Sequence, residues 1–438
     1  MKVFSKVLSV LAAALCLFSL CGCDLFESND ELLSPPRPQG ELYLVQKALS
    51  RVAPAEMQLK YPTAGQYRSA ITSVDIDGNG KNEAVAFFMT ESENITMMHL
   101  SVVYKSGDEW IATRDLSVVA SGVERVQFDD LDGDGVSEII VGWNVYTGVE
   151  KNLAVYSFKE GKLSHLLLEK YTEFITCDLD TDKQKELFLI NLNQTDKTAK
   201  AHIFKYGENG IEQLSGCHSD GNVSGYASLT EQKLLGGRQA IIVDALKGSR
   251  MHTEVFYLEN GALLNPLCDL ATNQTLITER PVSAPCRDIN GDGTLDIPIM
   301  SLMPGYEGAE EKDKLYFTRW CSFDGKNLNI TTYSAMNYED GYYFLIPKRL
   351  ENKITVVKSA SQKLRTVYLY DEAAKFHTEE LFRIQTFAPA DWNADKAQNG
   401  WVKLFSDENR VIAASLSPNA TEAITLEELT EMFKIIEG

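Results

Sequence analysis

A nine-residue acidic loop between two apolar runs constrains this chain more than any other feature. The best-preserved copy lies within Phe128–Trp143, FDDLDGDGVSEIIVGW, and leads directly into the apolar run IIVGW. Its ligand-type groups fall at loop positions 1, 3, 5, 7 and 9: Asp130, Asp132, Asp134, the backbone carbonyl of Val136, and Glu138. Oxygen atoms at these positions of a tight loop suit a hard cation such as Ca²⁺. Glycines at positions 4 and 6 supply the positive φ angles that such a loop needs.

The loop occurs four times, so it is a repeat and not a single site. The copies begin at Asp75, Asp130, Asp178 and Asp288, with separations of 55, 48 and 110 residues. In the other three copies the residues at positions 1, 3, 5, 7 and 9 are Asp75, Asp77, Asn79, Lys81 and Glu83; Asp178, Asp180, Asp182, Gln184 and Glu186; and Asp288, Asn290, Asp292, Thr294 and Asp296. Because 110 is twice 55, we expect one further unit near Leu229–Gly237 that has lost its loop but kept its exit strand.

A second repeat has the same phase. Aromatic-rich hairpins such as VVYKSGDEW, VYSFKEGKL and VFYLENGAL fall between successive loop positions, so one unit recurs every ~53 residues, the length of a propeller blade. Residues 41–418 have room for seven such units. The sequence therefore predicts an all-β fold: a β-propeller of seven four-stranded blades, with a short N-terminal helix and a C-terminal helix. We expect a strand around Met57–Tyr61 to close the ring and remove exposed sheet edges. The unbroken period argues against the alternative of separate β-sandwich modules.

The spacing excludes an EF-hand, which needs a bidentate Glu at position 12 and a helix after it. Position 12 is apolar in each copy: Ala86, Val141, Leu189 and Ile299. A nine-residue acidic loop between two strands instead resembles the FG-GAP (or VCBS) repeat of integrin α subunits and bacterial surface proteins. The Phe-Gly and Gly-Ala-Pro signatures of the integrin members are not evident, so the resemblance is to the bacterial variety. It implies a seven-bladed propeller with Ca²⁺ bound in the blade loops, here at four structural sites.

Electrostatic repulsion favours a bound metal over ordinary acidic turns. The four loops hold fourteen carboxylates, three each in the first and fourth copies and four each in the second and third. Two carboxylates ~4 Å apart repel by about 4 kcal/mol at an effective dielectric constant near 20. A single Asp-Gly turn would need no metal, but four copies at matched phase indicate cation sites. The third loop has Thr181 and Lys183 where the other loops have Gly, and we expect it to bind Ca²⁺ most weakly.

The N-terminus predicts export and a lipid anchor. Lys2 and Lys6 precede an apolar run of 14 residues that is too short to span a bilayer and is typical of a signal peptide. The following Leu-Cys-Gly-Cys resembles a bacterial lipobox, which implies cleavage before Cys23 and lipidation of its thiol; an ordinary secretory signal is the alternative. The predicted domains are a lipoprotein signal peptide (1–22), a proline-rich tether (23–40), the propeller (41–418) and a C-terminal helix (419–438). The expected location is the cell envelope, on the extracytoplasmic side of the membrane.

Charge and motifs limit the function. Without Lys2 and Lys6 the chain has 40 basic and 62 acidic residues, a net charge of −22 that disfavours nucleic acid and anionic lipid surfaces. No GxSxG, HExxH, P-loop or GxGxxG motif is present. We therefore predict no enzymatic activity and a membrane-anchored, calcium-stabilised module that recognises a protein or a glycan. The membrane would be contacted through the lipid anchor only. The alternative function is a propeller-fold polysaccharide lyase or hydrolase.

Overall fold

The fold is a row of antiparallel β-sheets. The computed structural model describes residues 40–53, 57–92, 95–113, 116–145 and 151–436, and these residues form six sheets. The first sheet contains β1 (Gln58–Leu59), β2 (Ile71–Val74), β3 (Glu83–Ser92), β4 (Ile95–Ser106), β5 (Glu109–Ala112) and β6 (Leu116–Val119). The second contains β7 (Gly122–Asp129), β8 (Glu138–Asn144), β9 (Lys151–Lys159) and β10 (Lys162–Tyr171). The third contains β11 (Glu173–Cys177), β12 (Glu186–Asn193), β13 (Thr198–Gly207) and β14 (Gly210–Ser219).

The other sheets continue this order. The fourth sheet contains β15 (Gly225–Lys233), β16 (Gln239–Lys247), β17 (Arg250–Glu259) and β18 (Ala262–Leu264). The fifth contains β19 (Ile297–Leu302), β20 (Tyr316–Phe323), β21 (Leu328–Asn337), β22 (Tyr342–Ile346) and β28 (Phe433–Ile435). The sixth contains β23 (Ile354–Ser359), β24 (Leu364–Asp371), β25 (Phe376–Phe387), β26 (Trp401–Ser406) and β27 (Val411–Leu416). The α-helices are α3 (Glu41–Leu49), α4 (Ala394–Gln398) and α5 (Leu426–Met432), and the short 3₁₀ helices are η1 (Glu311–Asp313), η2 (Lys348–Leu350), η3 (Ala360–Gln362) and η4 (Pro389–Asp391).

The sheets stack face to face because alternate residues of each strand point to opposite neighbours. On β3, Val85 and Phe87 pack with the second sheet, whereas Ala86 between them packs on the opposite face. On β8, Trp143 belongs to the core shared with the first sheet, and Ile140 belongs to the core shared with the third. Each described interface therefore has its own apolar layer, as expected for repeats that contact only their neighbours.

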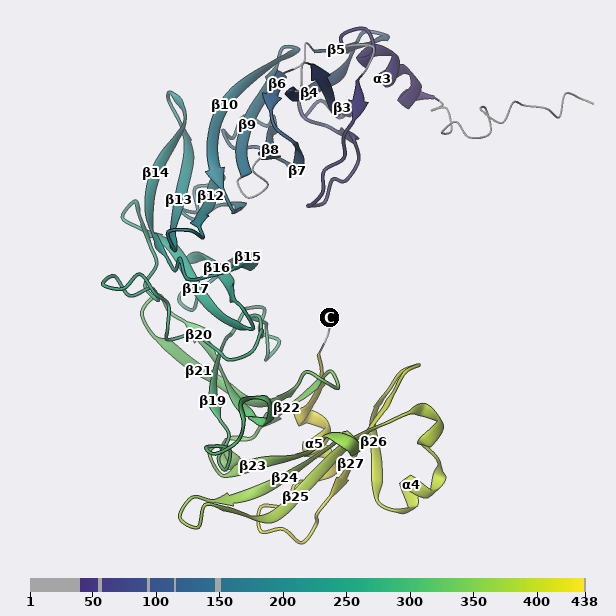
Figure 1. Ribbon diagram of the computed structural model, residues 1–438, viewed down its shortest axis with the longest axis vertical. Coiled ribbons are helices and arrows are strands. Elements are labelled where there is room, and N and C mark those ends of the chain that lie inside the picture. Colours follow the sequence, from purple (N-terminus) through teal and green to yellow (C-terminus); the bar gives the residue numbers. More distant parts are fainter. Residues whose placement is uncertain (1–39, 54–56, 93–94, 114–115, 146–150, 437–438) are drawn as a thin grey trace, which may run out of the picture.

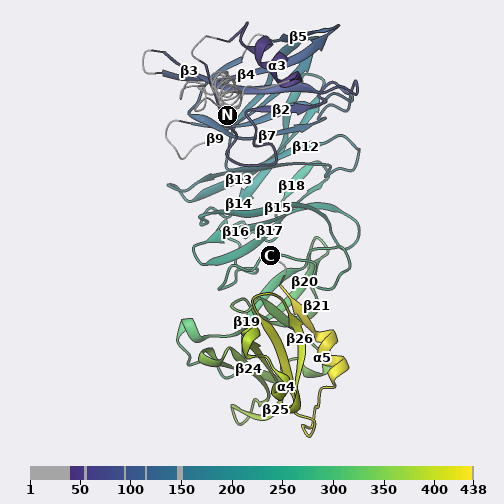
Figure 2. The same cartoon turned by 90° about the vertical axis from the view of Figure 1, so that its right-hand side faces the viewer.

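The row is an open arc whose two ends are separately covered (Figure 1). Helix α3 places Val45 and Leu49 on the outer face of the first sheet, against Phe88. At the other end, Trp392 and Trp401 pack with the apolar face of β25 and β27 that points away from the fifth sheet. Figure 2 shows the same succession of sheets from the side. Each end of the arc thus buries its outer apolar residues against its own segment and not against the other end.

The structure confirms the all-β class and the four-stranded antiparallel sheets, but not seven blades. The strand around Tyr342–Ile346 completes the fifth sheet, and the last two predicted strands, β26 and β27, join the sixth sheet through β25. The predicted closing strand is wrong, because Gln58–Leu59 pairs with β3 of the first sheet. The predicted C-terminal helix is also shorter than expected: α5 ends at Met432 and the next residues pair with β22 as β28. Thr425 caps the N-terminus of α5, since its Oγ1 accepts the Glu428 N–H at 3.1 Å.

The fourth sheet lacks an acidic loop, as predicted, and a buried polar network lies beside it. A tight turn joins β15 to β16, with the Leu234 N–H donating to the Arg238 carbonyl at 2.8 Å. The segment 265–287, which follows β18, is held to this sheet by the Arg280–Asp244 ion pair of 2.8 Å, and both side chains are almost fully buried. Fully buried Glu254 accepts hydrogen bonds from the Ser219 hydroxyl at 2.6 Å and the Asn265 amide at 2.7 Å. Hydrogen-bonded networks rigidify an insertion, whereas an unpaired buried charge would destabilise it.

Two further observations concern the remaining cysteines and the membrane. The five cysteines after the signal region are free thiols: Cys177, Cys217, Cys268, Cys286 and Cys321. Burial raises the pKa of Cys268 and of Cys321 to about 11, so these thiols stay protonated at neutral pH. Within the part of the chain that the structure describes, no helix has the length and apolar character to cross a membrane.

The helix that covers the first sheet predicts a measurable stability difference. Leu49 is fully buried against the sheet, so Leu49→Ala should lower the free energy of unfolding by about 2–5 kcal/mol. Leu42 on the same helix is 46% exposed, and Leu42→Ala should change it by less than about 0.5 kcal/mol. Urea denaturation of both variants checks this expectation. Equal losses would show that α3 does not cover the sheet in solution.

Candidate metal sites in the acidic loops

Each acidic loop is anchored by the same buried pair of groups. The residue at position 2 is apolar and buried, and its N–H donates to the carboxylate at position 9. The donors, acceptors and distances are Ile76 to Glu83 (2.9 Å), Leu131 to Glu138 (2.9 Å), Leu179 to Glu186 (2.8 Å) and Ile289 to Asp296 (3.4 Å). Position 9 also begins β3, β8 and β12 in the first three copies. The buried apolar residue at position 2 therefore fixes a carboxylate at the start of the strand that follows the loop.

The other carboxylates are oriented by backbone N–H groups of the loop. In the second loop, Asp130 accepts from the Gly135 N–H at 2.9 Å, Asp132 from Asp134 at 3.2 Å, and Asp134 from Val136 at 2.9 Å. The same three hydrogen bonds, from positions 6, 5 and 7, occur in the other copies at 2.8–3.3 Å. The sequence repeat is thus a repeat of loop geometry, and it is confirmed in all four copies.

Positions 4 and 6 have positive φ angles in every copy, as the loop requires. Three copies place glycine at both positions, with φ between 70° and 86°. In the third loop these positions are Thr181 (φ 62°) and Lys183 (φ 77°), where a Cβ atom makes the conformation unfavourable. The predicted strain of the third loop is therefore present. Its weaker affinity for Ca²⁺ stays a prediction.

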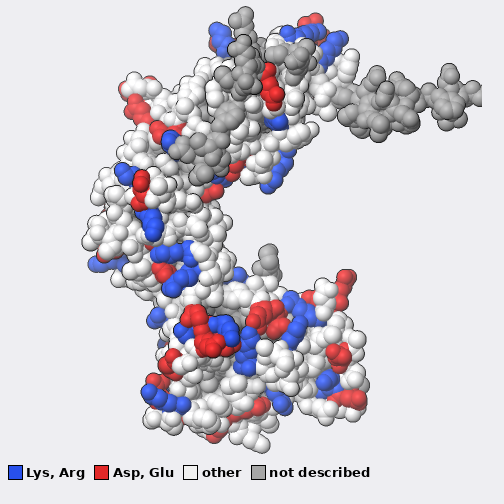
Figure 3. Space-filling view, in the orientation of Figure 1, with Lys and Arg blue, Asp and Glu red and all other residues white. Residues whose placement is uncertain are grey.

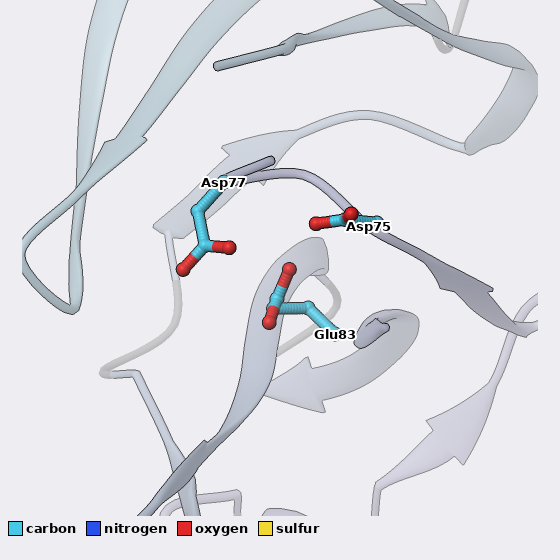
Figure 4. A group of neighbouring side chains, drawn as sticks. All are labelled: Asp75, Asp77 and Glu83. Atoms are coloured by element: carbon cyan, nitrogen blue, oxygen red, sulfur yellow. The ribbon is translucent and has the colours of Figure 1, made fainter. Parts of the chain in front are cut away.

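Three loops bring carboxylates close enough to hold one ion. In the first loop, oxygen atoms of Asp75, Asp77 and Glu83 lie within 4.8 Å of one another, and Figure 4 shows the three side chains directed toward a common centre. The equivalent groups of the other two loops are Asp130, Asp132 and Glu138, and Asp178, Asp180 and Glu186. The fourth loop has an amide, Asn290, in place of the second carboxylate. These acidic clusters form candidate metal sites made of oxygen atoms alone, the donor set of a hard cation.

The buried carboxylates are unfavourable as anions without a cation. Burial raises the pKa of Glu138 to about 7. The hydrogen bond from the Leu131 N–H acts to lower this pKa, and the neighbouring charge of Asp132 acts to raise it. Glu186 has a pKa raised to about 7 for the same main reason, and the pKa values of Glu83 and Asp296 are also raised by burial. Glu138 Oε1 is buried and has no hydrogen-bond partner. A buried polar atom without a partner is rare in folded proteins and fits a missing ligand at this position.

Sequence analysis did not identify two lysines that reach into these clusters. Lys159 Nζ lies 2.8 Å from Asp132 Oδ2 and 2.6 Å from Asp134 Oδ2 in the second loop. Lys205 Nζ lies 2.7 Å from Asp182 Oδ2 in the third loop and also contacts Asp180. Both lysines lie near the ends of strands in the hairpins that follow the loops, at positions that carried no repeat pattern.

The acidic loops lie side by side along one rim of the arc. The Ser137 N–H of the second loop donates to the Ile76 carbonyl of the first at 2.7 Å. The Gln184 side chain of the third loop donates to the Leu131 carbonyl of the second at 2.9 Å, so this side chain points away from its own cluster. The contribution of the position 7 carbonyls to the sites stays a prediction. The predicted lipidation site Cys23 lies outside the described residues.

Comparison with known proteins gives structural matches only. No family model and no curated protein sequence matches the chain. Among solved structures, a periplasmic gluconolactonase from Pseudomonas aeruginosa is 13% identical, covers 73% of this chain and 85% of its own, and has a TM-score of 0.29. A rhamnogalacturonan lyase from Bacillus licheniformis is 12% identical, with coverage of 74% and 76% and a TM-score of 0.30. The exotype rhamnogalacturonan lyase YesX is 12% identical, with coverage of 84% and 91% and a TM-score of 0.30.

These matches correct the prediction that the chain is not an enzyme. That prediction used the absence of a catalytic sequence motif, whereas the matched structures are named as a lactonase and lyases. The absence of a motif therefore does not exclude catalysis. Identities of 12–13% and TM-scores of 0.29–0.30 transfer no substrate to this chain.

The raised pKa of Glu138 predicts a pH dependence of the calcium-free protein. Its folded-state pKa of about 7 exceeds the ordinary value of 4.5, so the folded protein binds this proton more tightly than the unfolded chain. Its contribution to stability is therefore complete below pH 4.5 and is lost as pH rises toward 7. In EDTA, Glu138→Gln should make the stability decline less steeply over this range in urea denaturation. Glu109→Gln, on an exposed strand end, is the control; parallel curves for wild type and Glu138→Gln would contradict the assignment.

Proposed function

We propose that this chain is an extracytoplasmic, calcium-stabilised repeat protein of propeller type that recognises a protein or a glycan. Ca²⁺ would occupy the four acidic loops and have a structural role. The observation that carries the proposal is the convergence of the carboxylates at positions 1, 3 and 9 in three consecutive loops of the same geometry. When bound, the ion supplies the positive charge that allows the buried position 9 carboxylates to ionise. The residues of the chain fix the loop and the start of the strand that follows it.

The location is proposed from the sequence. A lipid-modified Cys23 would anchor the chain to the outer surface of a membrane, with residues 24–40 as a tether. Figure 3 shows basic and acidic side chains interspersed over the visible face of the molecule, without a single large basic patch that would favour an anionic surface. Mass spectrometry of the membrane-bound protein, with a search for a lipid-modified Cys23, tests this part of the proposal.

A ligand site away from the acidic loops is favoured by a cavity between the second and third sheets. The cavity has a volume of about 800 Å³ and is lined by Lys151, Lys170, Tyr171, Thr172 and residues 191–196. Three of the lining residues carry side-chain amides: Asn191, Asn193 and Gln194. Strand β8 begins at an acidic loop and ends at Asn144, which pairs with Lys151, so the cavity lies at the opposite strand ends. Amide, hydroxyl and ammonium groups around one cavity suit a hydroxyl-rich ligand such as a glycan.

A second candidate function, a polysaccharide lyase or hydrolase, is favoured by the same cavity. Lysine and tyrosine are residue types that transfer protons in general acid–base catalysis. The Tyr171 hydroxyl donates to Glu124 Oε2 at 2.8 Å, and burial raises the pKa of Tyr171 well above its usual range, so it keeps its proton. The Lys151 ammonium lies 4.7 Å from the centre of the Tyr171 ring. These groups are the ones to examine if the protein cleaves a glycan.

Removal of the metal tests the structural role of Ca²⁺. A site that binds only the folded chain and is filled at about 100 times its Kd adds about 2.7 kcal/mol to stability. Ca²⁺ should therefore raise the melting temperature above that in EDTA, and Asp75→Asn/Asp130→Asn should reduce the rise. Differential scanning calorimetry measures both effects. Asp371→Asn, in an exposed hairpin turn, serves as the control, and identical melting temperatures with and without Ca²⁺ would refute the proposal.

A polysaccharide screen separates recognition from cleavage. Immobilised neutral and acidic polysaccharides should retain the wild-type protein, and Asn191→Ala or Asn193→Ala should reduce retention at least about tenfold, the value of losing one well-placed contact of 1.4 kcal/mol. New reducing ends, or absorbance of unsaturated ends, would identify hydrolase or lyase activity. Retention without new ends supports recognition alone. Retention that both variants leave unchanged would place the ligand elsewhere.

A further inference from the structure

The four loops differ in whether a lysine contacts them, and this difference follows the charges at positions 3 and 5. The second loop has Asp132 and Asp134 at these positions, and the third has Asp180 and Asp182; a lysine ammonium bridges each pair. The first loop has an amide at position 5, Asn79, and no described lysine contacts it. The presence of a bridging lysine thus coincides with a carboxylate at both position 3 and position 5.

In the fourth loop an amide group, not a lysine, contacts the carboxylate at position 5. Its position 3 is Asn290, whose amide Nδ2 donates to Asp292 Oδ2 at position 5 with a distance of 2.9 Å. Asp292 is also held by the Thr294 N–H at 2.8 Å. Here an amide supplies the hydrogen bond that lysine supplies in the second and third loops. No described lysine reaches this loop.

The two lysines approach their loops from different positions in the sheets. Phe204 pairs with Leu187, so Lys205 lies level with Glu186 at position 9 of the third loop. Tyr156 pairs with Ile139, so Ser157 lies level with Glu138 and Lys159 lies two residues further along β9. Two unrelated strand positions therefore place an ammonium group at the same point of the loop. Such convergence indicates a requirement of the loop and not an incidental surface contact.

The two lysines also contact different numbers of carboxylates. Lys205 Nζ reaches Glu186 Oε1 at 3.0 Å as well as the two aspartates, and its side chain is 20% exposed. The side chain of Lys159 is 43% exposed, and its described ion pairs are with Asp132 and Asp134, not with Glu138. The lysine of the third loop therefore neutralises three carboxylates, and the lysine of the second loop neutralises two.

We propose that Lys159 and Lys205 are tethered counter-cations that compete with Ca²⁺ for the carboxylates at positions 3 and 5 of the second and third loops. The proposal rests on the proposed calcium role and divides the four sites into two classes. The first and fourth loops depend on Ca²⁺ alone. The second and third loops keep their geometry without the ion, because an ammonium group attached to the neighbouring strand replaces it. In these two loops Ca²⁺ must displace the lysine, and the third loop resists displacement most strongly.

Substitution of the lysines by methionine tests the competition, since methionine keeps the length of the side chain and removes its charge. Lys205→Met and Lys159→Met should raise the Ca²⁺ affinity of their loops roughly tenfold, because two or three ion pairs no longer oppose binding. Both variants should melt at a lower temperature than wild type in EDTA and should not do so in saturating Ca²⁺. Lys105→Met is the matched control: Lys105 lies near the end of β4 beside the first loop, is exposed and makes no ion pair with a described residue. Isothermal titration and calorimetry measure these quantities.

A second substitution separates competition from a general loss of stability. In the Lys205→Met background, Asp182→Asn gives the third loop the amide that the first loop has at position 5. The double variant should recover the wild-type melting temperature in EDTA. A loss of stability of the same size in EDTA and in Ca²⁺, with unchanged affinity, would overturn the counter-cation role and leave the calcium role intact. If wild type binds no Ca²⁺, gain of binding in the methionine variants would still support competition, whereas no binding in any variant would overturn both proposals.

Discussion

Repulsion between carboxylates on alternate residues of a tight loop is the constraint on which each unit depends. In the first three copies the loop joins the first strand of a unit to the second, and its ninth residue starts that second strand. A carboxylate is fixed there by the N–H of a buried apolar residue, so it cannot move away from its neighbours. At ~4 Å each such pair costs about 4 kcal/mol at an effective dielectric constant near 20. Strand pairing and loop charge are thus coupled, and a cation stabilises both.

The chain offsets buried acidic charge in more than one way. Oxygen clusters at three loops suit a free cation, and two of them also hold an ammonium group. Beside the fourth sheet, where the loop is absent, Asp244 is instead paired with buried Arg280. Removal of one partner of a buried ion pair typically costs about 3–5 kcal/mol, so this arginine is as integral to its unit as a metal would be to the others. The units share a backbone arrangement but differ in the cation that offsets their buried acidic charge.

The sequence predicts the local parts of this fold well and the long-range parts poorly. Loop geometry, the hairpins, α3 and the lost loop of the fourth unit all follow from residues close together in the sequence. The number of sheets does not, because nothing local to Tyr342–Ile346 or Trp401–Ser406 indicates which neighbouring sheet each strand joins, and only pairing with β21 or β27 decides. Lys159 and Lys205 were missed for a similar reason: they occupy different register positions, so no sequence period marks them. The lack of a catalytic motif was also a weak argument, because residues that act together in a site can lie far apart in the sequence.

An arc with covered ends has mechanical consequences that a closed ring would not have. Six sheets in a row meet at five interfaces, and each interface is a separate apolar layer (Figure 1). Small rotations at these layers add in series, so the distance between α3 and α4 depends on the sum of all of them. The acidic loops follow one another along one rim, where Ser137 and Gln184 hydrogen-bond to the preceding loop. These hydrogen bonds tie neighbouring sheets together along the rim, in addition to the apolar layers between them.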